Sequence, residues 1–142
     1  MKPCRLIYKS VAQPGVFDTN SLRVLANNAA NNNRRLGVCG ILTISNSSFL
    51  QVLEGTPRFV NEIFVKIVKD ERHRDIELIS YEEIVKSEFD DWDMKLVELN
   101  QIDASIKNLL ENKYPVENGH FKFTSDAFLM LSLLVDLKNI KS

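Results

Sequence analysis

The chain has 142 residues, enough for one globular domain with or without a short appendage. Its composition, 44% hydrophobic and 26% charged, excludes a disordered, fibrous or coiled-coil protein, and its net charge of -1 argues against direct nucleic-acid binding. With only two cysteines and two histidines, the chain is unlike a disulfide scaffold or a metal centre. Its N-terminus is charged and no run of about 18 apolar residues is present, so we expect a cytoplasmic protein without a membrane span.

The first hundred residues alternate between strand and helix patterns. Apolar strand patterns cover five segments and amphipathic helix patterns cover two: strands at 5–9, 37–44, 49–54, 76–84 and 92–99, and helices from Asp18 into the Asn run 27–33 and from Thr56-Pro57 to Val68. The resulting order, βαββαββ, predicts an α+β, ferredoxin-like fold, in which a mixed five-stranded sheet carries two helices on one face.

The pattern changes after Asn100. Two more helices are expected at 102–110 and 125–140, separated by a break at 114–119. We therefore divide the chain into a domain at 1–100 and a two-helix cap or output segment at 101–142, which would cover the other face of the sheet. The second helix is apolar nearly all round, which predicts burial on every side, either within the monomer or against a second subunit or partner.

Gln51 is the clearest break in the strand patterns. Period-two alternation puts it on the same strand face as Phe49 and Leu53. A buried amide left unpaired costs about 1–3 kcal/mol, so its oxygen and its NH2 group both need partners. Tyr8, which shares a strand face with Leu6, presents the same problem. Either the two side chains satisfy each other or a water and do nothing more, or they offer a phenol and an amide to a ligand beneath the helices.

The Asn run at 27–33 also has two interpretations. Asn is common at helix ends, so a frayed helix end is the simpler one. Alternatively, these amides can donate and accept at the edge of a planar heterocycle such as flavin or a base.

Two further segments have ordinary structural explanations when each is taken alone. Trp92 and Met94 alternate on one strand face, as core residues often do. The charged segment 70–73 is typical of a solvated helix end, and His73 has no partners at metal-ligand spacing. The chain shows no phosphate loop, nucleophile elbow or catalytic carboxylate pair, so no enzymatic activity is expected.

Five segments, in order and at compatible spacing, resemble the BLUF (blue-light-using flavin) photoreceptor domain. They are Leu6-Ile7-Tyr8-x-Ser10, the Asn pair before Gly37-x-x-Gly40, Phe49-Leu50-Gln51-Val52-Leu53-Glu54-Gly55, Asp70-Glu71-Arg72-His73 and Trp92-x-Met94. The resemblance covers about residues 3–100, and the remainder loosely resembles the helical cap of short stand-alone members. It implies a blue-light sensor with FAD held between the two helices.

The resemblance also implies roles for single residues. Tyr8 would be the electron donor and Gln51 the switching amide, while Trp92 and Met94 would report the switch to the last strand. The other implied flavin contacts are Leu25 and Ile67 on the two sides of the ring, Asn32 and Asn33 (or Asn31 and Asn32) at its edge, Lys66 near the pyrimidine, and Asp70, Arg72 and His73 near the ribityl chain and phosphates.

Three positions depart from the pattern of the family. Cys39 stands where Thr is common, and Lys66 replaces an Arg, which exchanges a bidentate contact for a point charge. The segment 87–89 lacks the usual basic residue before its Phe. None of the three is part of the Tyr-Gln-Asn group, so the photochemistry is expected to survive, whereas flavin affinity and the dark recovery rate stay open.

Other functions and the partners also stay open. A small phosphatase would use Arg34 or Arg35 with an Asn, although no matching phosphate loop is present. A light-independent regulatory or oligomerisation module would use the apolar helix at 125–140 as its interface. For a photosensor we expect a homo-oligomer and a downstream protein, such as a response regulator or transcription regulator, on fold-level analogy alone.

Overall fold

A computed structural model of the protein describes residues 2–15, 17–91 and 94–140. Its strands are β1 (Cys4–Ala12), β2 (Cys39–Ser45), β3 (Ser48–Gly55), β4 (His73–Glu83), β5 (Lys95–Glu98), β6 (Val116–Glu117) and β7 (His120–Phe121). Its α-helices are α1 (Thr19–Leu36), α2 (Pro57–Lys69), α3 (Ala104–Lys113) and α4 (Ala127–Asn139), and a 3-10 turn, η1 (Leu99–Gln101), follows β5.

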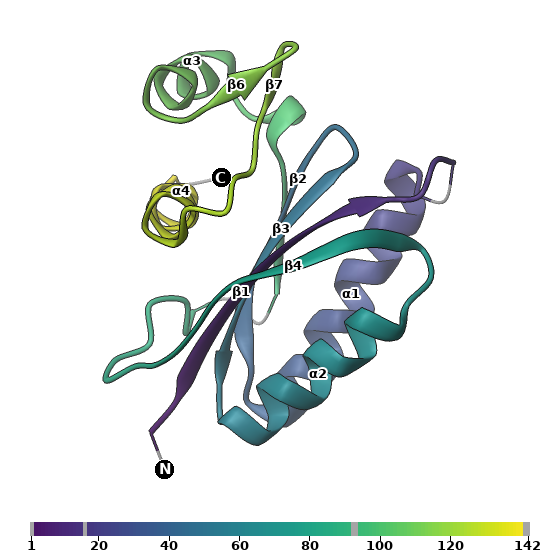
Figure 1. The fold of residues 1–142 in the computed structure, drawn as a ribbon, viewed down its shortest axis with the longest axis vertical. Coiled ribbons are helices and arrows are strands. Elements are labelled where there is room, and N and C mark those ends of the chain that lie inside the picture. Colours follow the sequence, from purple (N-terminus) through teal and green to yellow (C-terminus); the bar gives the residue numbers. More distant parts are fainter. Residues whose placement is uncertain (1, 16, 92–93, 141–142) are drawn as a thin grey trace.

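The main sheet has five strands in the order β4-β1-β3-β2-β5. Its neighbours are antiparallel except for β2 and β5, which are parallel. Helices α1 and α2 lie on one face and α4 on the other, while α3 and the β6–β7 hairpin lie above α4 in the view of Figure 1, near the turn between β2 and β3. The ferredoxin-like prediction, with a mixed sheet and two helices on one face, is therefore confirmed. We call α3, β6, β7 and α4 together the cap.

Two apolar layers form on the two faces of the sheet because successive strand residues point in opposite directions. Leu6 and Leu53 pack under α1 and α2 with Val60, and all three are at most 1% exposed. The alternate strand residues, such as Ile7 and Val52, pack instead against the cap. The sheet thus separates a helical layer from a cap layer, and each strand contributes to both.

Local signals in the sequence set the ends of α1. Asp18 caps its first turn by accepting from Ser21 N, and the Ser21 side chain accepts in return from the Asp18 backbone. Gly37 ends the helix with a φ of 70°, a left-handed conformation that glycine adopts without strain. The helix runs unbroken through the Asn run, so the interpretation of that run as a frayed end is wrong. Because the helix continues through the run, Asn28 and Asn32 lie one turn apart on the same face.

Helix α2 begins where the Thr56-Pro57 pair predicts it, because proline has no N–H to leave unpaired in the first turn. The strand before it, β3, lies very close to β2 at Gly40. A β-carbon built on Gly40 would lie 1.9 Å from Val52 O, so any side chain there would collide with the neighbouring backbone. Glycine at this position lets β2 and β3 pair.

The C-terminal third differs from the prediction in three places. The last strand of the main sheet begins at Lys95 rather than at 92, and Trp92 lies outside the described residues. The predicted break at 114–119 contains part of a small hairpin, β6–β7. Helix α4 buries one face on the sheet, where Leu134 is fully buried, but Phe128 is 85% exposed. This contradicts the alternative in which the helix is buried on every side within the monomer, while burial of the other side against a second subunit or partner stays a prediction.

Within residues 2–15, 17–91 and 94–140, no helix combines the length with the apolar character that crossing a bilayer requires.

Candidate functional site

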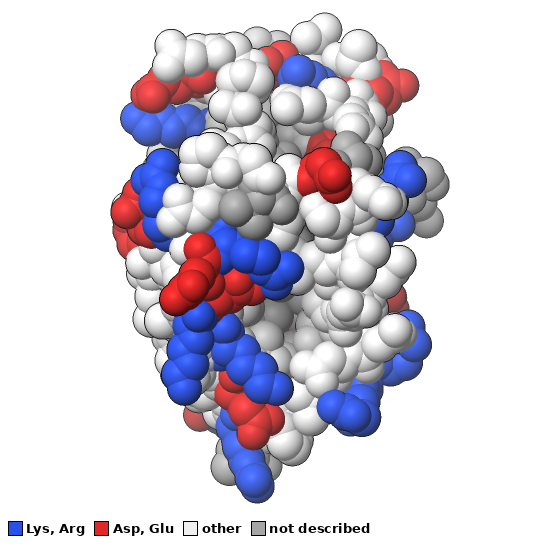
Figure 2. Space-filling model, turned by 90° about the vertical axis from the view of Figure 1, so that its right-hand side faces the viewer, with Lys and Arg blue, Asp and Glu red and all other residues white. Residues whose placement is uncertain are grey.

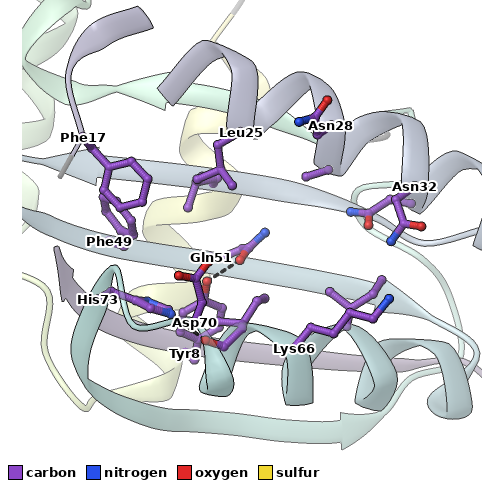
Figure 3. A pocket seen from close by; sticks show the side chains of 15 residues that line it. Tyr8, Phe17, Leu25, Asn28, Asn32, Phe49, Gln51, Lys66, Asp70 and His73 are labelled. Carbon is purple, nitrogen blue, oxygen red and sulfur yellow. Dashed lines mark hydrogen bonds between the residues drawn. The ribbon is translucent and has the colours of Figure 1, made fainter. Parts of the chain in front are cut away.

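A cleft of about 280 Å³ opens between α1, α2 and the helical face of the sheet (Figure 3). Its volume is close to the lower end of the usual range for ligand sites, roughly 300–1,000 Å³. The lining side chains come from β1, the segment before α1, α1, β2, β3, α2 and the turn and strand after it: Tyr8, Phe17, Leu25, Asn28, Ala29, Asn32, Asn33, Leu42, Phe49, Gln51, Ile63, Lys66, Ile67, Asp70 and His73. The helical side of the molecule also carries a band of charged side chains beside a broad uncharged area (Figure 2).

Tyr8 and Gln51 meet on the sheet wall of this cleft. Their strands pair with Tyr8 directly opposite Gln51, so both side chains point to the same face. The Tyr8 hydroxyl donates a hydrogen bond to Gln51 Oε1, and Gln51 Nε2 donates to Met94 Sδ at 3.3 Å. Tyr8, Gln51 and Met94 are 2%, 5% and 7% exposed. The expected bond between the two polar side chains is confirmed, and Met94 accepts one of the two N–H groups of the Gln51 amide.

Burial and charge keep the Tyr8 phenol protonated. Burial raises the pKa of Tyr8 well above its ordinary value, and the negative charge of Asp70 raises it further. Asp70 itself stays ionised, because hydrogen bonds from the Arg72 guanidinium hold the pKa of the Asp70 carboxyl below its usual value. Tyr8 is therefore a neutral O–H donor in the resting protein.

The α1 wall of the cleft presents three asparagines. Asn32 and Asn33 line it as the sequence predicts, whereas Asn31 is exposed and is not among its lining residues. Asn28 also lines it, one helical turn before Asn32, and sequence reasoning missed it. The missed signal is the spacing 25, 28, 29, 32 and 33, which traces a single face of a helix. Asn32 Oδ1 accepts from Arg35 at 2.9 Å, and this bond orients its amide.

Apolar side chains form the two broad sides of the cleft. Leu25 of α1 and Ile67 of α2, both predicted, line it together with Ile63. Phe17 and Phe49 close one end with ring centroids 5.4 Å apart. The two phenylalanines were not predicted, although Phe49 lies two residues before Gln51 and so shares its strand face.

The charged segment after α2 lies at the same end of the cleft. Asp70 and His73 line it, but Arg72 does not: its guanidinium bonds to Asp70 at 2.6 Å and lies over the Phe17 ring at 5.2 Å. Both ring nitrogens of His73 are engaged, Nε2 with Ile67 O at 2.6 Å and Nδ1 with Ser10 Oγ at 3.0 Å. His73 thus ties the last turn of α2 to β1.

Lys66 completes the α2 wall. It is exposed, lines the cleft and lies across it from Asn32 (Figure 3). The cleft therefore has a polar end with amides on one side and an ammonium on the other.

The side chains that line the cleft fit an isoalloxazine ring. Such a ring is planar, with broad apolar faces and one edge of alternating carbonyl and N–H groups. Leu25, Ile63 and Ile67 supply apolar sides, and the amides of Asn32 and Gln51 can donate to carbonyls and accept from N–H groups.

Comparison with known proteins agrees with this chemistry. The family described as sensors of blue light using FAD matches residues 4–95. The β subunit of the photoactivated adenylate cyclase of Euglena gracilis is 34% identical over 92 residues, which cover 64% of this chain and 11% of that protein. The chain thus spans about a tenth of the length of the curated relatives it matches.

Solved structures extend the likeness into the cap. The ground state of BlsA matches with a TM-score of 0.72 and 29% identity over 94% of this chain and 87% of that one. The dark state of the BLUF protein BlrB matches with a TM-score of 0.64 and 29% identity over 76% and 83%. With the family match spanning residues 4–95, these similarities show that the chain belongs to the BLUF family of blue-light sensors that use FAD.

Proposed function

We propose that this chain holds FAD in the cleft between α1 and α2, and that Tyr8 and Gln51 are its photoactive pair. The observation that carries the proposal is the buried Tyr8–Gln51 hydrogen bond in the wall of a cleft with apolar sides and an amide-rich end. Buried polar side chains in a strand are usually paired for stability alone, but here the pair borders a space of ligand size.

The individual contacts follow from the lining. Leu25 and Ile67 would hold the two faces of the ring, while Asn32, Asn33 and Lys66 would bind its polar edge. Asp70 and His73 would lie near the ribityl chain, and Arg72 would act indirectly by fixing the Asp70 carboxylate. Asn28 joins this set as a contact on α1.

When bound, the flavin supplies a chromophore that becomes a strong one-electron oxidant in blue light. Tyr8 is an oxidisable side chain in direct contact with Gln51, and its hydroxyl proton already points at Gln51 Oε1. Loss of an electron makes that proton acidic, so it moves along the existing bond to Gln51. When the electron returns to Tyr8, a proton returns to its oxygen as well, so that Tyr8 is again a neutral phenol. Gln51 would then be left in a rearranged state, by rotation or tautomerisation, in which its bond to Met94 is changed. A change of roughly 1–2 kcal/mol in one hydrogen bond is enough to shift a two-state equilibrium.

The test is an absorption spectrum of the purified chain before and after blue light. A yellow protein whose flavin band shifts slightly to the red and then recovers in darkness supports the proposal. A colourless chain that cannot be reconstituted with FAD would instead favour a light-independent regulatory or oligomerisation module. A Gln51→Ala variant that retained the red shift would refute the relay role of the amide.

We also propose that output passes to another protein rather than to a reaction catalysed by this chain. The photoactivated cyclase relatives are many times longer than the matched segment, so their named activity is not carried over here. The bond from Gln51 to Met94, immediately before β5, gives a route toward η1 and the cap. A response regulator or transcription regulator is the class of partner we propose, with size-exclusion chromatography in both light states to measure a change of assembly.

A further inference from the structure

Glu54 is a buried carboxylate that the photoactive pair does not use. It lies on β3 three residues after Gln51, on the opposite face of the sheet, and is 1% exposed. A carboxylate so deeply buried needs several donors, because leaving a charge unpaired inside a protein is very unfavourable.

The donors to Glu54 come mainly from one short loop. Its Oε1 accepts from Ser87 Oγ at 2.7 Å and from the backbone N–H groups of Glu88 and Phe89, each at 2.9 Å. Its Oε2 accepts from Arg5 Nε at 2.8 Å. One carboxylate thus fixes three consecutive loop residues to the centre of the sheet. We call residues 87–89 the anchored segment.

The anchored segment also contacts the cap. Phe89 is fully buried in the apolar core that includes Leu133 and Leu134 of α4. Glu88 approaches Lys138 of α4 at 3.8 Å. This segment therefore joins the sheet to the cap by hydrogen bonds, apolar packing and an ion pair.

Five residues further along the chain from Phe89, Met94 receives the hydrogen bond of Gln51. The stretch 87–94 is thus bonded to β3 at both of its ends, to Glu54 on the cap face and to Gln51 on the helical face. A displacement that begins at Met94 can be taken up by the preceding loop only if that loop is free to move. Holding residues 87–89 shortens the part of that loop that can take up a displacement at Met94, so more of the displacement passes forward into β5 and the cap.

We infer that Glu54 is a positioning residue that couples the Gln51–Met94 contact to the cap by anchoring residues 87–89. The inference rests on the proposed function, since it needs a light-driven change at Gln51.

Two departures of this sequence from the family pattern fall at this anchor. Cys39 Sγ lies 3.9 Å from Glu54 Oε1 and 3.8 Å from Ser87 Oγ, and Ser87 opens the segment that lacks a basic residue.

The test compares hydrogen exchange of the FAD-loaded full chain in darkness and in blue light. In Glu54→Gln, one carboxylate oxygen becomes an NH2 group and the negative charge is lost. Whichever way the amide turns, either Arg5 Nε or the N–H groups of Glu88 and Phe89 lose their acceptor, and each bond that remains is weaker because the acceptor is no longer charged. The N–H groups of Glu88 and Phe89 should then exchange at least about tenfold faster in darkness, which corresponds to about 1.4 kcal/mol of lost protection. The red shift should keep its size because Glu54 faces away from the cleft, but the light-minus-dark difference over α3 and α4 should disappear.

Two further variants make the result specific. Glu82→Gln removes a half-exposed carboxylate that also bonds to Arg5, at 3.3 Å, and should leave both the red shift and the cap response unchanged. Ser87→Ala removes one donor to Glu54 while keeping the carboxylate and its bond to Arg5, and should reduce the cap response. If Glu54→Gln does not fold, Ser87→Ala decides the question.

Each outcome separates the two proposals. A full cap response in Glu54→Gln, or an unchanged one in Ser87→Ala, would overturn the coupling role. The coupling role would also be overturned by a wild-type chain that shows the red shift but no light-dependent change of hydrogen exchange in the cap. This result would leave the proposed function intact. A wild-type chain with no red shift would overturn the proposed function and the coupling with it, while fast dark exchange at 88–89 in Glu54→Gln would still show that Glu54 is the anchor.

Discussion

Replacing Tyr8 with Phe isolates the hydroxyl on which the proposed photochemistry depends. The change keeps the ring that packs against Phe64, at a centroid distance of 5.6 Å, and removes only the O–H that Gln51 Oε1 accepts. The cleft retains its apolar sides and its asparagines, so the variant should bind FAD and remain yellow. It should show no red shift, because no proton points at the amide oxygen.

The same substitution has a predictable effect on stability. Gln51 is 5% exposed, so its Oε1 would be left without a donor inside the protein. A buried acceptor without a partner costs about 1–3 kcal/mol. For a chain of this size, each kcal/mol lowers the melting temperature by roughly 2–4 °C, so a fall of roughly 2–12 °C is expected in thermal unfolding followed by circular dichroism.

Tyr114 provides a matched control on the other face of the sheet. It is 4% exposed, and its hydroxyl donates to Asp136 and lies 2.8 Å from Ser132 Oγ, within the cap. Tyr114→Phe should lower stability less, because Asp136 is partly exposed and keeps its bond to Lys113 at 2.7 Å, and it should keep the full red shift. The reasoning would be refuted by a red shift that persists in Tyr8→Phe, or by one that vanishes in Tyr114→Phe as well.

Three further predictions concern the asparagines, one carboxylate and one glycine. Asn32→Ala should weaken FAD binding in a fluorescence titration, whereas Asn31→Ala should bind FAD like the wild type, and equal losses would contradict the assignment of the cleft-lining pair. The folded-state pKa of Asp70 is lowered, so its contribution to stability should be fully present above its unfolded pKa of about 3.9 and be lost as pH falls through the folded value. Asp70→Asn should therefore flatten that part of a stability–pH curve measured by urea unfolding. An unchanged curve would show that the ion pair between Asp70 and Arg72 contributes nothing. Gly40→Ala should prevent folding or cost several kcal/mol in chemical denaturation, because its β-carbon would lie 1.9 Å from a backbone oxygen of β3. In the control Gly119→Ala, the added β-carbon has no atom within 4 Å, so the change should cost only about 1 kcal/mol for the φ of 79°.

The sequence predicts the fold well because most of its signals are local. Asp18, Gly37 and the Thr56-Pro57 pair set helix ends through bonds and dihedral angles within a few residues. Alternation along β3 correctly places Gln51 under the helices. Such features need no knowledge of distant contacts.

The failures arise where distant contacts decide. The helix at Asn31–Asn33 continues because α1 packs on the sheet, which outweighs the poor helix propensity of asparagine. The Glu54 anchor joins residues more than 30 positions apart and leaves no periodic signal in the sequence.

The partners of Gln51 also set the orientation of its amide before any light is absorbed. Its oxygen faces a donor, the Tyr8 hydroxyl, and its NH2 group faces an acceptor, Met94 Sδ. Rotation of the amide by half a turn would still allow its NH2 group to donate to the Tyr8 oxygen, but it would point Oε1 at a sulfur that has no proton to give. An unpaired buried oxygen costs about 1–3 kcal/mol, so the protein alone favours the first orientation by roughly 5- to 150-fold. The rotated state therefore gains population only when something else in the cleft offers the displaced groups a partner, and the flavin that we propose for this cleft would bring such a group beside Gln51.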